Sequence, residues 1–430
     1  MKRKDFLKGL ILSTFSASAL ASDKNPAVSE SKSIFSYGAK GDGSNDDSAA
    51  FKKYFEHHDV LQIPEGRTFM IGNIILKGKT VRGPGRIRIK PGSKAVFILE
   101  GNNNSIQDIN FLSIGTGKRP ECELMLGREL EMATIRGCIF EGKLFSTVGS
   151  ELNDTKDKKY VSLPWRSKLI ISECNFKGSY AHHLYFHRLR EVIVQSNFFE
   201  GSGLDSIRLR QWVQNINIVN NHFKDIGTSN STDSKDAIDC YWSGLNLNIS
   251  NNQFENISTH ALDIKGHSPD ADYGTSKVLI VGNQIRNAGF NGILISSAAK
   301  TLKGWKAIKN ITVANNLIEG CGSKTQNPND AAIFMRHNQE QILLEGNQIF
   351  RNRHKGIMLG NFEKDAPNSR NILIKGNIIT ENGSFGIHVS GGENVLVSGN
   401  ILDKNEKGIV SESYRNFKLV NFKSSENIES

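Results

Sequence analysis

The stretch from Ala181 to His267 contains four copies of one short pattern: HLYFH at 183–187, SIRLR at 206–210, AIDCY at 237–241 and ALDIK at 261–265. In each copy a small or polar residue precedes two apolar residues that alternate with two variable ones. Successive side chains of a β-strand face opposite sides, so the apolar pair is predicted to point into a core and the variable pair outward. The stretch therefore predicts four stacked strands with one common outer face.

The outward positions of these strands carry residues that hold anions and move protons. One column contains Tyr185, Arg208, Asp239 and Asp263, and the column beside it contains His187, Arg210, Tyr241 and Lys265. The matching positions of later copies are apolar: Leu294, Phe334 and Met358. This concentration of charge on four consecutive copies favours a functional site.

A longer repeat extends the pattern along the chain from Asn73 onward. An apolar run is followed by Asn, one residue, and then Phe, Ile or Leu. The equivalent asparagines are Asn197, Asn221, Asn252, Asn283, Asn316, Asn347, Asn377 and Asn400, and Cys138 and Cys174 take the place earlier. The spacing suits one coil of three short strands with variable insertions. Identical asparagines on successive coils are expected to form a hydrogen-bonded ladder inside a bend.

The repeat predicts an all-β fold, a single-stranded parallel β-helix or solenoid. A leucine-rich repeat requires regular Leu spacing, whereas Ile, Val, Asn and Gly dominate here. A β-propeller requires longer units. The repeat also overrides the expectation of two or three domains for 430 residues.

The segment before the repeat has its own signature. SYGAKGDGSNDDSAAF at 36–51 indicates a Gly-rich turn, an Asp/Ser helix start and a short helix to about His57. Together with VLQIPEG at 60–66 it resembles the amino-terminal signature of the pectate-lyase superfamily of polysaccharide lyases, polygalacturonase-like hydrolases and phage tailspike depolymerases. The resemblance implies a right-handed parallel β-helix whose end this segment caps. Its aspartates, Asp42, Asp46 and Asp47, are expected to serve the turn and the cap.

The N-terminus indicates export. Residues 1–21 combine a basic start, an apolar run and a small-x-small site ending at Ala21, which is typical of a signal peptide. The RKDFLK run at 3–8 resembles a twin-arginine signal with Lys for the second Arg, so both export routes stay open. Residues 22–33 are expected to be a flexible lead-in, and 34–430 the β-helix with its N-terminal cap. A periplasmic or extracellular location follows, and no second apolar stretch predicts a membrane span.

Composition sets limits on the partner. The formal net charge is +10, and it falls to +7 without residues 1–21, which hold four basic and one acidic residue. A basic chain suits an acidic polysaccharide, and the absence of a nucleic-acid module disfavours DNA or RNA. The five cysteines lack metal-type spacing. Buried free thiols are expected, with a Cys138–Cys174 disulfide as the alternative.

The candidate site residues follow from the two columns and their flanks. The candidate catalytic residues are Tyr185, His183, His187, Arg208, Arg210, Asp239, Tyr241, His260, Asp263 and Lys265. The candidate substrate-binding residues are His182, Trp242, His267, Arg336 and His337. No cofactor is demanded, but Asp205, Asp236, Asp239 and Asp263 form a candidate calcium site, because Ca²⁺ takes oxygen ligands.

Three sugar reactions use such residues. A lyase neutralises a uronate carboxylate, removes the C5 proton and assists departure of the O4 group. An epimerase returns that proton on the opposite face, and a hydrolase uses two carboxylates. Polygalacturonase-like proteins carry Gly-His-Gly and Asp-Asp motifs that the charged copies lack, which disfavours hydrolysis. The columns therefore favour β-elimination of an acidic, uronate-containing polysaccharide.

Two less specific interpretations stay open. The aspartates, Arg208 and Lys265 are also compatible with a surface salt-bridge ladder of small energetic worth. The chain is also compatible with a non-catalytic β-helix that binds a glycan or serves in polysaccharide assembly.

Overall fold

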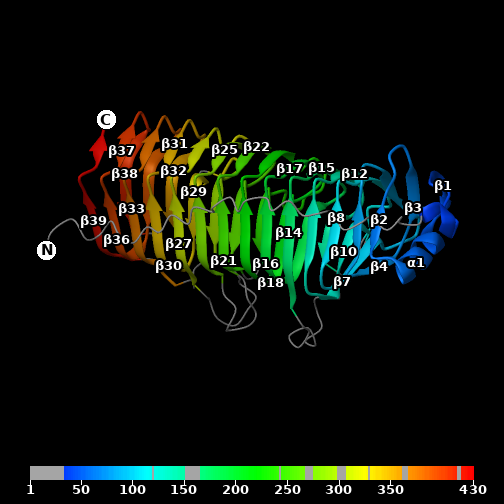
Figure 1. Ribbon diagram of the computed structural model, residues 1–430. Helices are drawn as coiled ribbons and strands as arrows, with labels where there is room; N and C mark the ends of the chain where they lie inside the picture. The colour runs from blue at the N-terminus through cyan, green and yellow to red at the C-terminus, as the bar shows by residue number, and fades with distance from the viewer. Residues whose placement is uncertain are drawn as a thin grey trace, which may run out of the picture. The chain divides into compact units, whose positions relative to one another are not determined.

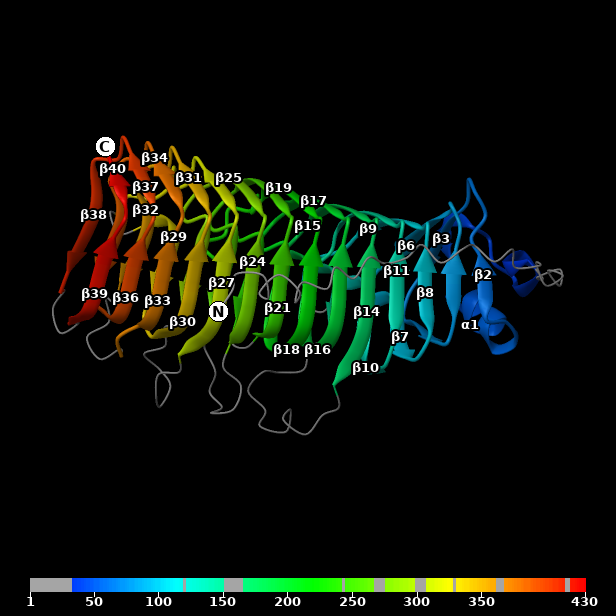
Figure 2. The same cartoon turned by 60° about the vertical axis from the view of Figure 1, so that its left-hand side comes forward.

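Short parallel strands dominate the computed structural model, in which they stack in chain order along one unit, Ile34–Ser430 (Figures 1 and 2). The structure describes residues 33–118, 121–150, 165–241, 244–266, 275–297, 307–327, 330–360, 367–413 and 418–430. The predicted signal peptide and, apart from Ser33, the predicted lead-in lie outside the described residues.

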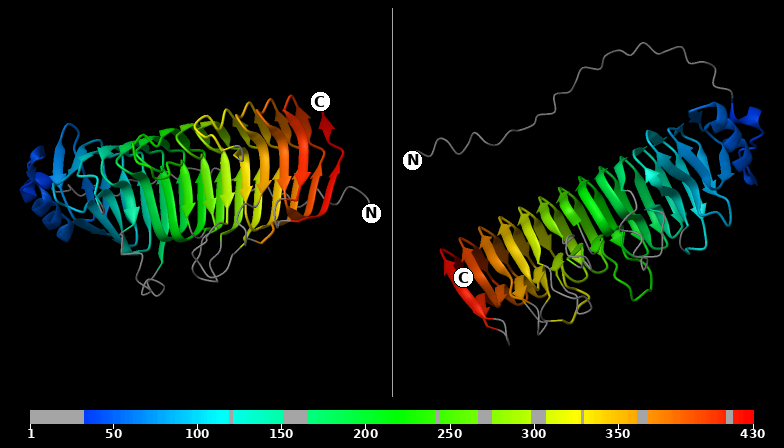
Figure 3. Two further views of the ribbon diagram at one scale, coloured as in Figure 1. Left: turned by 180° about the vertical axis from the view of Figure 1, so that it is seen from behind. Right: turned by 90° about the horizontal axis from the view of Figure 1, so that it is seen from below.

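Three strand faces wind around the core, and we name them A, B and C. Every pairing between strands is parallel and joins one coil to the next, as a β-helix requires. The views from behind and below show the same chain-order stacking (Figure 3). The prediction of an all-β parallel solenoid is confirmed.

Face A is a separate sheet. Its strands are β1 (Asp42–Asp46), β3 (Thr68–Ile71), β6 (Arg86–Ile89), β9 (Asn110–Ile114), β12 (Ile139–Lys143), β15 (Asn175–Ser179), β17 (Phe198–Ser202), β19 (His222–Ile226), β22 (Gln253–Ile257), β25 (Gln284–Ala288), β28 (Leu317–Glu319), β31 (Gln348–Phe350), β34 (Ile378–Thr380), β37 (Ile401–Asp403) and β40 (Ile428–Glu429).

Faces B and C are joined, because β16 (His182–Gln195) and β18 (Ile207–Val219) continue from B into C around a corner. At this corner Arg188 and Trp212 adopt positive φ angles of 51° and 54°. The other face B strands are β4 (Ile74–Lys77), β7 (Ala95–Gly101), β10 (Cys122–Leu130), β13 (Ser146–Ser150), β20 (Ile238–Tyr241), β23 (Leu262–Lys265), β26 (Ile293–Ser296), β29 (Ala331–Arg336), β32 (Lys355–Gly360), β35 (Phe385–Ser390) and β38 (Lys407–Glu412).

Face C completes each coil. Its other strands are β2 (Val60–Gln62), β5 (Thr80–Arg82), β8 (Asn104–Gln107), β11 (Ala133–Arg136), β14 (Arg166–Ser172), β21 (Gly244–Ser250), β24 (Ser276–Val281), β27 (Ile308–Ala314), β30 (Gln339–Glu345), β33 (Arg370–Lys375), β36 (Gly392–Ser398) and β39 (Leu419–Ser425).

Identical side chains stack inside the coils. Six phenylalanines of face A form a continuous stack with ring centroids 4.7–4.9 Å apart: Phe111, Phe140, Phe176, Phe199, Phe223 and Phe254. The asparagine ladder is confirmed, since the side-chain oxygen of each asparagine accepts from the previous coil, as with Asn252 Nδ2 donating to Asn283 Oδ1 at 3.0 Å. These stacks satisfy buried polar groups and fill the core along the axis.

The N-terminal cap covers the first coil. Helix α1 (Ser48–His57), preceded by a 3₁₀ turn at Ile34–Tyr37, buries Phe51 against Phe69 and Phe97. The aspartates serve the turn and the helix start as predicted: Asp47 accepts from the backbone of Lys40 and Gly41, and Asp46 accepts from Ser48. The Gly-rich segment is therefore structural.

Two details follow from the stacking. All five cysteines are free and buried, as the simpler interpretation of the sequence held. Strands β39 and β40 pair with β36 and β37 and so continue the coils, as the assignment of residues 34–430 to the β-helix predicts.

Candidate functional site

The register of face B brings the two predicted columns together. Tyr185 pairs with Arg208, Arg208 with Asp239, and Asp239 with Asp263. In the second column His187 pairs with Arg210, and Arg210 with Tyr241. These side chains therefore belong to consecutive coils at the ordinary strand spacing of about 4.8 Å.

Arg208 lies between two buried carboxylates. Its Nη1 donates to Asp205 Oδ2 at 2.7 Å, and its Nη2 lies 3.3 Å from Asp239 Oδ2. Asp205 and Asp239 are fully buried, whereas the Arg208 side chain keeps 17% of its surface exposed. The arginine thus reaches the surface while its counter-charges lie beneath it.

Lys265 repeats this arrangement two coils further on. Its Nζ lies 2.5 Å from Asp263 Oδ2 and 2.9 Å from Asp239 Oδ1, with 18% of the side chain exposed. Burial disfavours its charge, but Asp263, Asp239 and Asp236 outweigh this effect and raise the pKa of Lys265 well above its ordinary value. Lys265 is therefore a fixed cation and a poor base.

The buried carboxylates have shifted acidities. Burial, together with the nearby Asp236 and Asp239, raises the pKa of Asp263 to about 6, against the opposing effect of Lys265 and His260. Burial and Asp239 likewise raise the pKa of Asp205 well above its ordinary value. Strongly shifted pKa values of this kind are typical of functional sites. Burying several charges together is costly for folding, so stability alone does not account for the cluster.

Tyr241 is the centre of the cationic surface. Its ring lies 5.8 Å from Arg208 Cζ, 5.6 Å from Arg210 Cζ and 5.6 Å from Lys265 Nζ, within range of cation–π attraction. Among the described residues no carboxylate lies within ion-pair distance of Arg210, and its buried Nε has no hydrogen-bond partner. Arg210 is therefore the cation of this surface that is available to an incoming anion.

The predicted histidines and Tyr185 occupy different environments. His182, His187 and Tyr185 are buried: His182 Nδ1 lies 3.2 Å from the Asp205 carbonyl, and His187 packs edge-on against Trp212. His183 does not reach the site. Its ring lies in the core beside Phe176 and Phe199, where burial lowers its pKa to about 3, so its position contradicts a catalytic role on face B.

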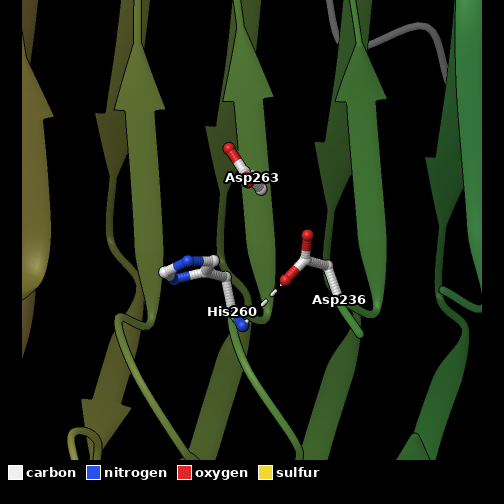
Figure 4. Close-up of side chains that lie close together, drawn as sticks. All are labelled: Asp236, His260 and Asp263. Atoms are coloured by element: carbon white, nitrogen blue, oxygen red, sulfur yellow. Dashed lines mark hydrogen bonds between the residues drawn. The ribbon is translucent and has the colours of Figure 1, made fainter. Parts of the chain in front are cut away.

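Asp236 and His260 lie at the turns that lead into β20 and β23, beside Asp263 (Figure 4). Asp236 Oδ1 accepts from Thr259 Oγ1 at 2.5 Å and from the His260 backbone at 3.0 Å, and its Oδ2 accepts from Ser234 Oγ at 2.5 Å. Burial alone would raise the pKa of Asp236, but His260, Lys265 and these hydrogen bonds outweigh it and lower that pKa. The Asp236 carboxylate therefore organises both turns.

The four candidate calcium ligands come together but do not fit the ion. Groups of Asp205, Asp236 and Asp239, and of Asp236, His260 and Asp263, lie close enough to share a cation. However, Arg208, Lys265, Ser234, Thr259 and backbone N–H groups already contact most of their oxygens, and Arg208 lies 3.3 Å from Asp239 Oδ2. Only Asp239 Oδ2 and Asp263 Oδ1 of these carboxylates lack a hydrogen-bond partner among the described residues. Two side-chain cations take the place that Ca²⁺ would need, so we route no step through a metal.

The remaining predicted binding residues are more distant. Arg336 stands in the second column two coils beyond Lys265, and its Nε lies 2.9 Å from Nε2 of the fully buried His337. Trp242 and His267 lie outside the described residues.

The repeated coils identify the protein family of this chain. The model of the right-handed β-helix region matches residues 94–272 and 271–424, well over half of the chain. The chain belongs to the right-handed β-helix family. The resemblance to the pectate-lyase superfamily, drawn from residues 36–66, is confirmed at the level of fold.

Solved structures of this family share the fold at low identity. The mannuronan C-5 epimerase A-module of Azotobacter vinelandii has 14% identity and a TM-score of 0.54, over 93% of this chain and 99% of that one. The tailspike of E. coli bacteriophage HK620, solved with a pentasaccharide, has 11% identity and a TM-score of 0.57. The match covers 91% of this chain and 80% of the tailspike chain. Gene product 12 of bacteriophage phi29 has 16% identity and a TM-score of 0.60, and the match covers 92% of this chain and 52% of that one.

No curated protein sequence gives a significant match. Among the described residues no helix is long and apolar enough to cross a membrane.

Two residues of the site and a neighbouring cleft were not predicted from the sequence. The residues are Ser234 and Thr259, whose hydroxyls hold Asp236, and the cleft is the one that they border. For Ser234 the available signal was its place two residues before the turn aspartate Asp236, because hydroxyl residues there commonly bond to turns. Thr259 lies 23 residues from Asp236 and carried no such signal.

Proposed function

We propose that this chain is a carbohydrate-active enzyme that cleaves an acidic, uronate-containing polysaccharide by β-elimination. The observation that carries the proposal is the surface around Tyr241, where Arg208, Arg210 and Lys265 surround one tyrosine and Arg210 has no carboxylate partner among the described residues. Such a surface suits a sugar that bears a carboxylate.

Binding and neutralisation of the uronate are assigned to the cations. Arg210 receives the carboxylate, since a guanidinium matches carboxylate geometry in a bidentate pair. Arg208 and Lys265 add positive potential, and the carboxylates beneath them hold both side chains in place. Neutralising the uronate charge makes its C5 proton easier to remove, because the developing anion is stabilised.

Proton transfer is assigned to the Tyr241 hydroxyl. Tyr241, acting as its phenolate, takes the C5 proton as a C4–C5 double bond forms. The C4–O bond breaks with its electron pair going to the leaving oxygen, which takes that proton from the Tyr241 hydroxyl. Lys265 and Arg208 are held as cations by the carboxylates beneath them, so Tyr241 is the residue of this surface suited to exchange the proton.

C5 epimerisation is the second candidate. It begins with removal of the same proton, and the epimerase A-module shares its fold with 93% of this chain. Hydrolysis is less well supported, because Asp239 and Asp263 are buried and bound to Arg208 and Lys265 rather than open to a glycosidic bond. A non-catalytic glycan-binding protein would use the same cations without turnover.

The experiment is a product assay on a panel of acidic and neutral polysaccharides. β-Elimination predicts absorbance from unsaturated uronate products, epimerisation predicts altered C5 configuration by NMR without chain cleavage, and hydrolysis predicts new reducing ends without that absorbance. Binding without any product would support the non-catalytic alternative, and neither binding nor product would overturn the proposal.

Export is part of the proposal, since polysaccharides of this kind lie outside the cytoplasm. Residues 1–21 carry the features of a signal peptide. The intact mass of the chain recovered from the periplasm or medium is expected to correspond to cleavage near Ala21. A full-length chain confined to the cytoplasm would contradict export.

A further inference from the structure

A cleft of about 420 Å³ lies at the turns that connect face A to face B, next to the acidic cluster. It is lined by residues of 231–235 and 258–260, by Phe290 and by Lys324. Its volume falls within the range of about 300–1,000 Å³ that is usual for small-molecule sites.

The cleft is built onto the candidate site. Three of its lining residues, Ser234, Thr259 and His260, are the ones whose hydroxyls or backbone N–H bind the buried Asp236 carboxylate. The backbone N–H of Asp236 in turn donates to Asp205 Oδ1 at 3.0 Å. One hydrogen-bond network therefore fixes both the cleft wall and the carboxylates beneath Arg208.

The opposite wall comes from later coils. Phe290 is half-buried, and its backbone N–H donates to the Thr259 carbonyl at 2.9 Å. Lys324 extends across the intervening coil, and its Nζ donates to Ser258 Oγ at 3.2 Å. A Cβ on Gly289 would lie 2.9 Å from Lys324 Cδ and 2.2 Å from the Ser258 carbonyl, so glycine is needed where this wall approaches the next coil.

The chemistry of the lining suits a sugar acid. Lys324 and Lys235 have no carboxylate partner within ion-pair distance among the described residues. Lys235 Nζ donates to the Ser229 carbonyl, and Lys324 Nζ donates to Ser258 Oγ. Serine and threonine hydroxyls match the hydroxyls of a sugar, and Phe290 offers an apolar face for the ring. His260 Nδ1 accepts from the Asn291 backbone at 3.2 Å, so the neutral ring carries its proton on Nε2.

We propose that this cleft is a uronate-binding subsite, in which Lys324 and Lys235 face the carboxylate and Phe290 packs against the sugar ring. It rests on the proposed function and adds a second recognition point, at the turn that leads into the strand of Tyr241 and at the turns of the coils that follow. Asp236 is a positioning residue, because it acts through Ser234, Thr259 and His260.

The test measures binding of tetragalacturonate and tetramannuronate to the full chain by calorimetry, with cellotetraose as the neutral comparison. Phe290→Ala and Lys324→Ala are each expected to weaken uronate binding by about tenfold, the usual worth of one stacking or charged contact. Phe198→Ala and Lys309→Ala are matched controls on faces A and C and are expected to bind like the wild type. Thermal unfolding checks that every variant is folded.

The outcomes separate the subsite from the proposed function. Uronate binding that weakens in both cleft variants supports the subsite, even if no turnover is found and the enzymatic proposal fails. Uronate binding or turnover that neither variant changes overturns the subsite and leaves the proposed function standing. Equal binding of cellotetraose overturns the assignment to a sugar acid, and no uronate binding by the wild type overturns both.

Discussion

At the scale of single residues, the site contains two cations that buried carboxylates bind and one cation without an acidic partner among the described residues. Arg208 and Lys265 are each bound by two carboxylates that solvent does not reach. Arg210 shares the Tyr241 ring with them but has no acidic partner in the described part of the chain. A buried charge network is a costly way to stabilise a fold, so its retention beside an available cation points to recognition of an anion.

Replacing Arg210 tests this directly. Arg210→Ala is expected to weaken binding of a tetrauronate by about 1.5–3 kcal/mol, the range of a charge-assisted hydrogen bond. The melting temperature is expected to change little, because the variant loses no ion pair of the described residues and only the cation–π contact with Tyr241. Calorimetry and thermal unfolding measure the two quantities. The control is Arg136→Ala, which removes an exposed arginine paired with Glu173. Undiminished uronate binding by Arg210→Ala would contradict the role.

Asp263→Asn is expected to change stability in a pH-dependent way. Because the pKa of Asp263 is raised to about 6 in the folded chain, the folded state holds the proton more tightly than the unfolded one. Stability therefore falls as the pH rises from about 4 to about 6 and is level above that. An asparagine avoids this loss, while Asp239 still holds Lys265.

Urea unfolding at pH 4 and pH 8 measures the effect. Asp263→Asn is expected to be more stable than the wild type at pH 8, and the difference is expected to shrink towards pH 4. The contrary result would be a variant that is less stable than the wild type at pH 8, by more than it is at pH 4. That result would show that the ionised carboxylate stabilises the fold.

Removal of metal is expected to change nothing. The oxygens of Asp205, Asp236 and Asp239 already accept hydrogen bonds or ion pairs from the chain. Calcium added at millimolar concentration, or its chelation by EDTA, should leave the melting temperature and any turnover as they were. A rise in melting temperature with calcium that EDTA reverses would show that the aspartates bind the ion.

At the scale of elements, strand alternation explains which site residues were predictable. Arg208, Asp239 and Asp263 fall in one column because each occupies the same place in its strand. Alternation does not hold at the start of β16, where His183 faces the core against Phe176. The Asp236 network joins turns of two coils through side chains, and such contacts between coils leave no period in the sequence.

The asparagine ladder carries a prediction of its own. Asn283 accepts from the backbone and side chain of Asn252, and its Nδ2 donates to the Ile249 carbonyl at 2.9 Å. Asn283→Ala leaves buried groups unsatisfied and is expected to lower the free energy of unfolding by about 2–4 kcal/mol. Asn248→Ala, at a half-buried position of β21, is expected to cost about 0.5 kcal/mol or less. Chemical denaturation compares them, and equal losses would contradict the role of the ladder.

At the scale of the whole molecule, the repeat made the fold predictable almost throughout. A 23–36-residue period, the Gly-rich segment at 36–51 and the Phe and Asn stacks each indicate the same architecture. The reaction is a matter of a few side chains on one face, and the fold places them without determining the chemistry.

The central claim is that the cationic surface around Tyr241 performs proton transfer on a uronate. The most direct measurement is the rate of unsaturated-uronate formation by the wild type and by Tyr241→Phe, which keeps the ring among Arg208, Arg210 and Lys265 but removes its hydroxyl. The account predicts that Tyr241→Phe binds the substrate normally and loses about 10²–10⁴-fold in kcat, the usual contribution of a general acid or base. A variant that forms the product as fast as the wild type would contradict it.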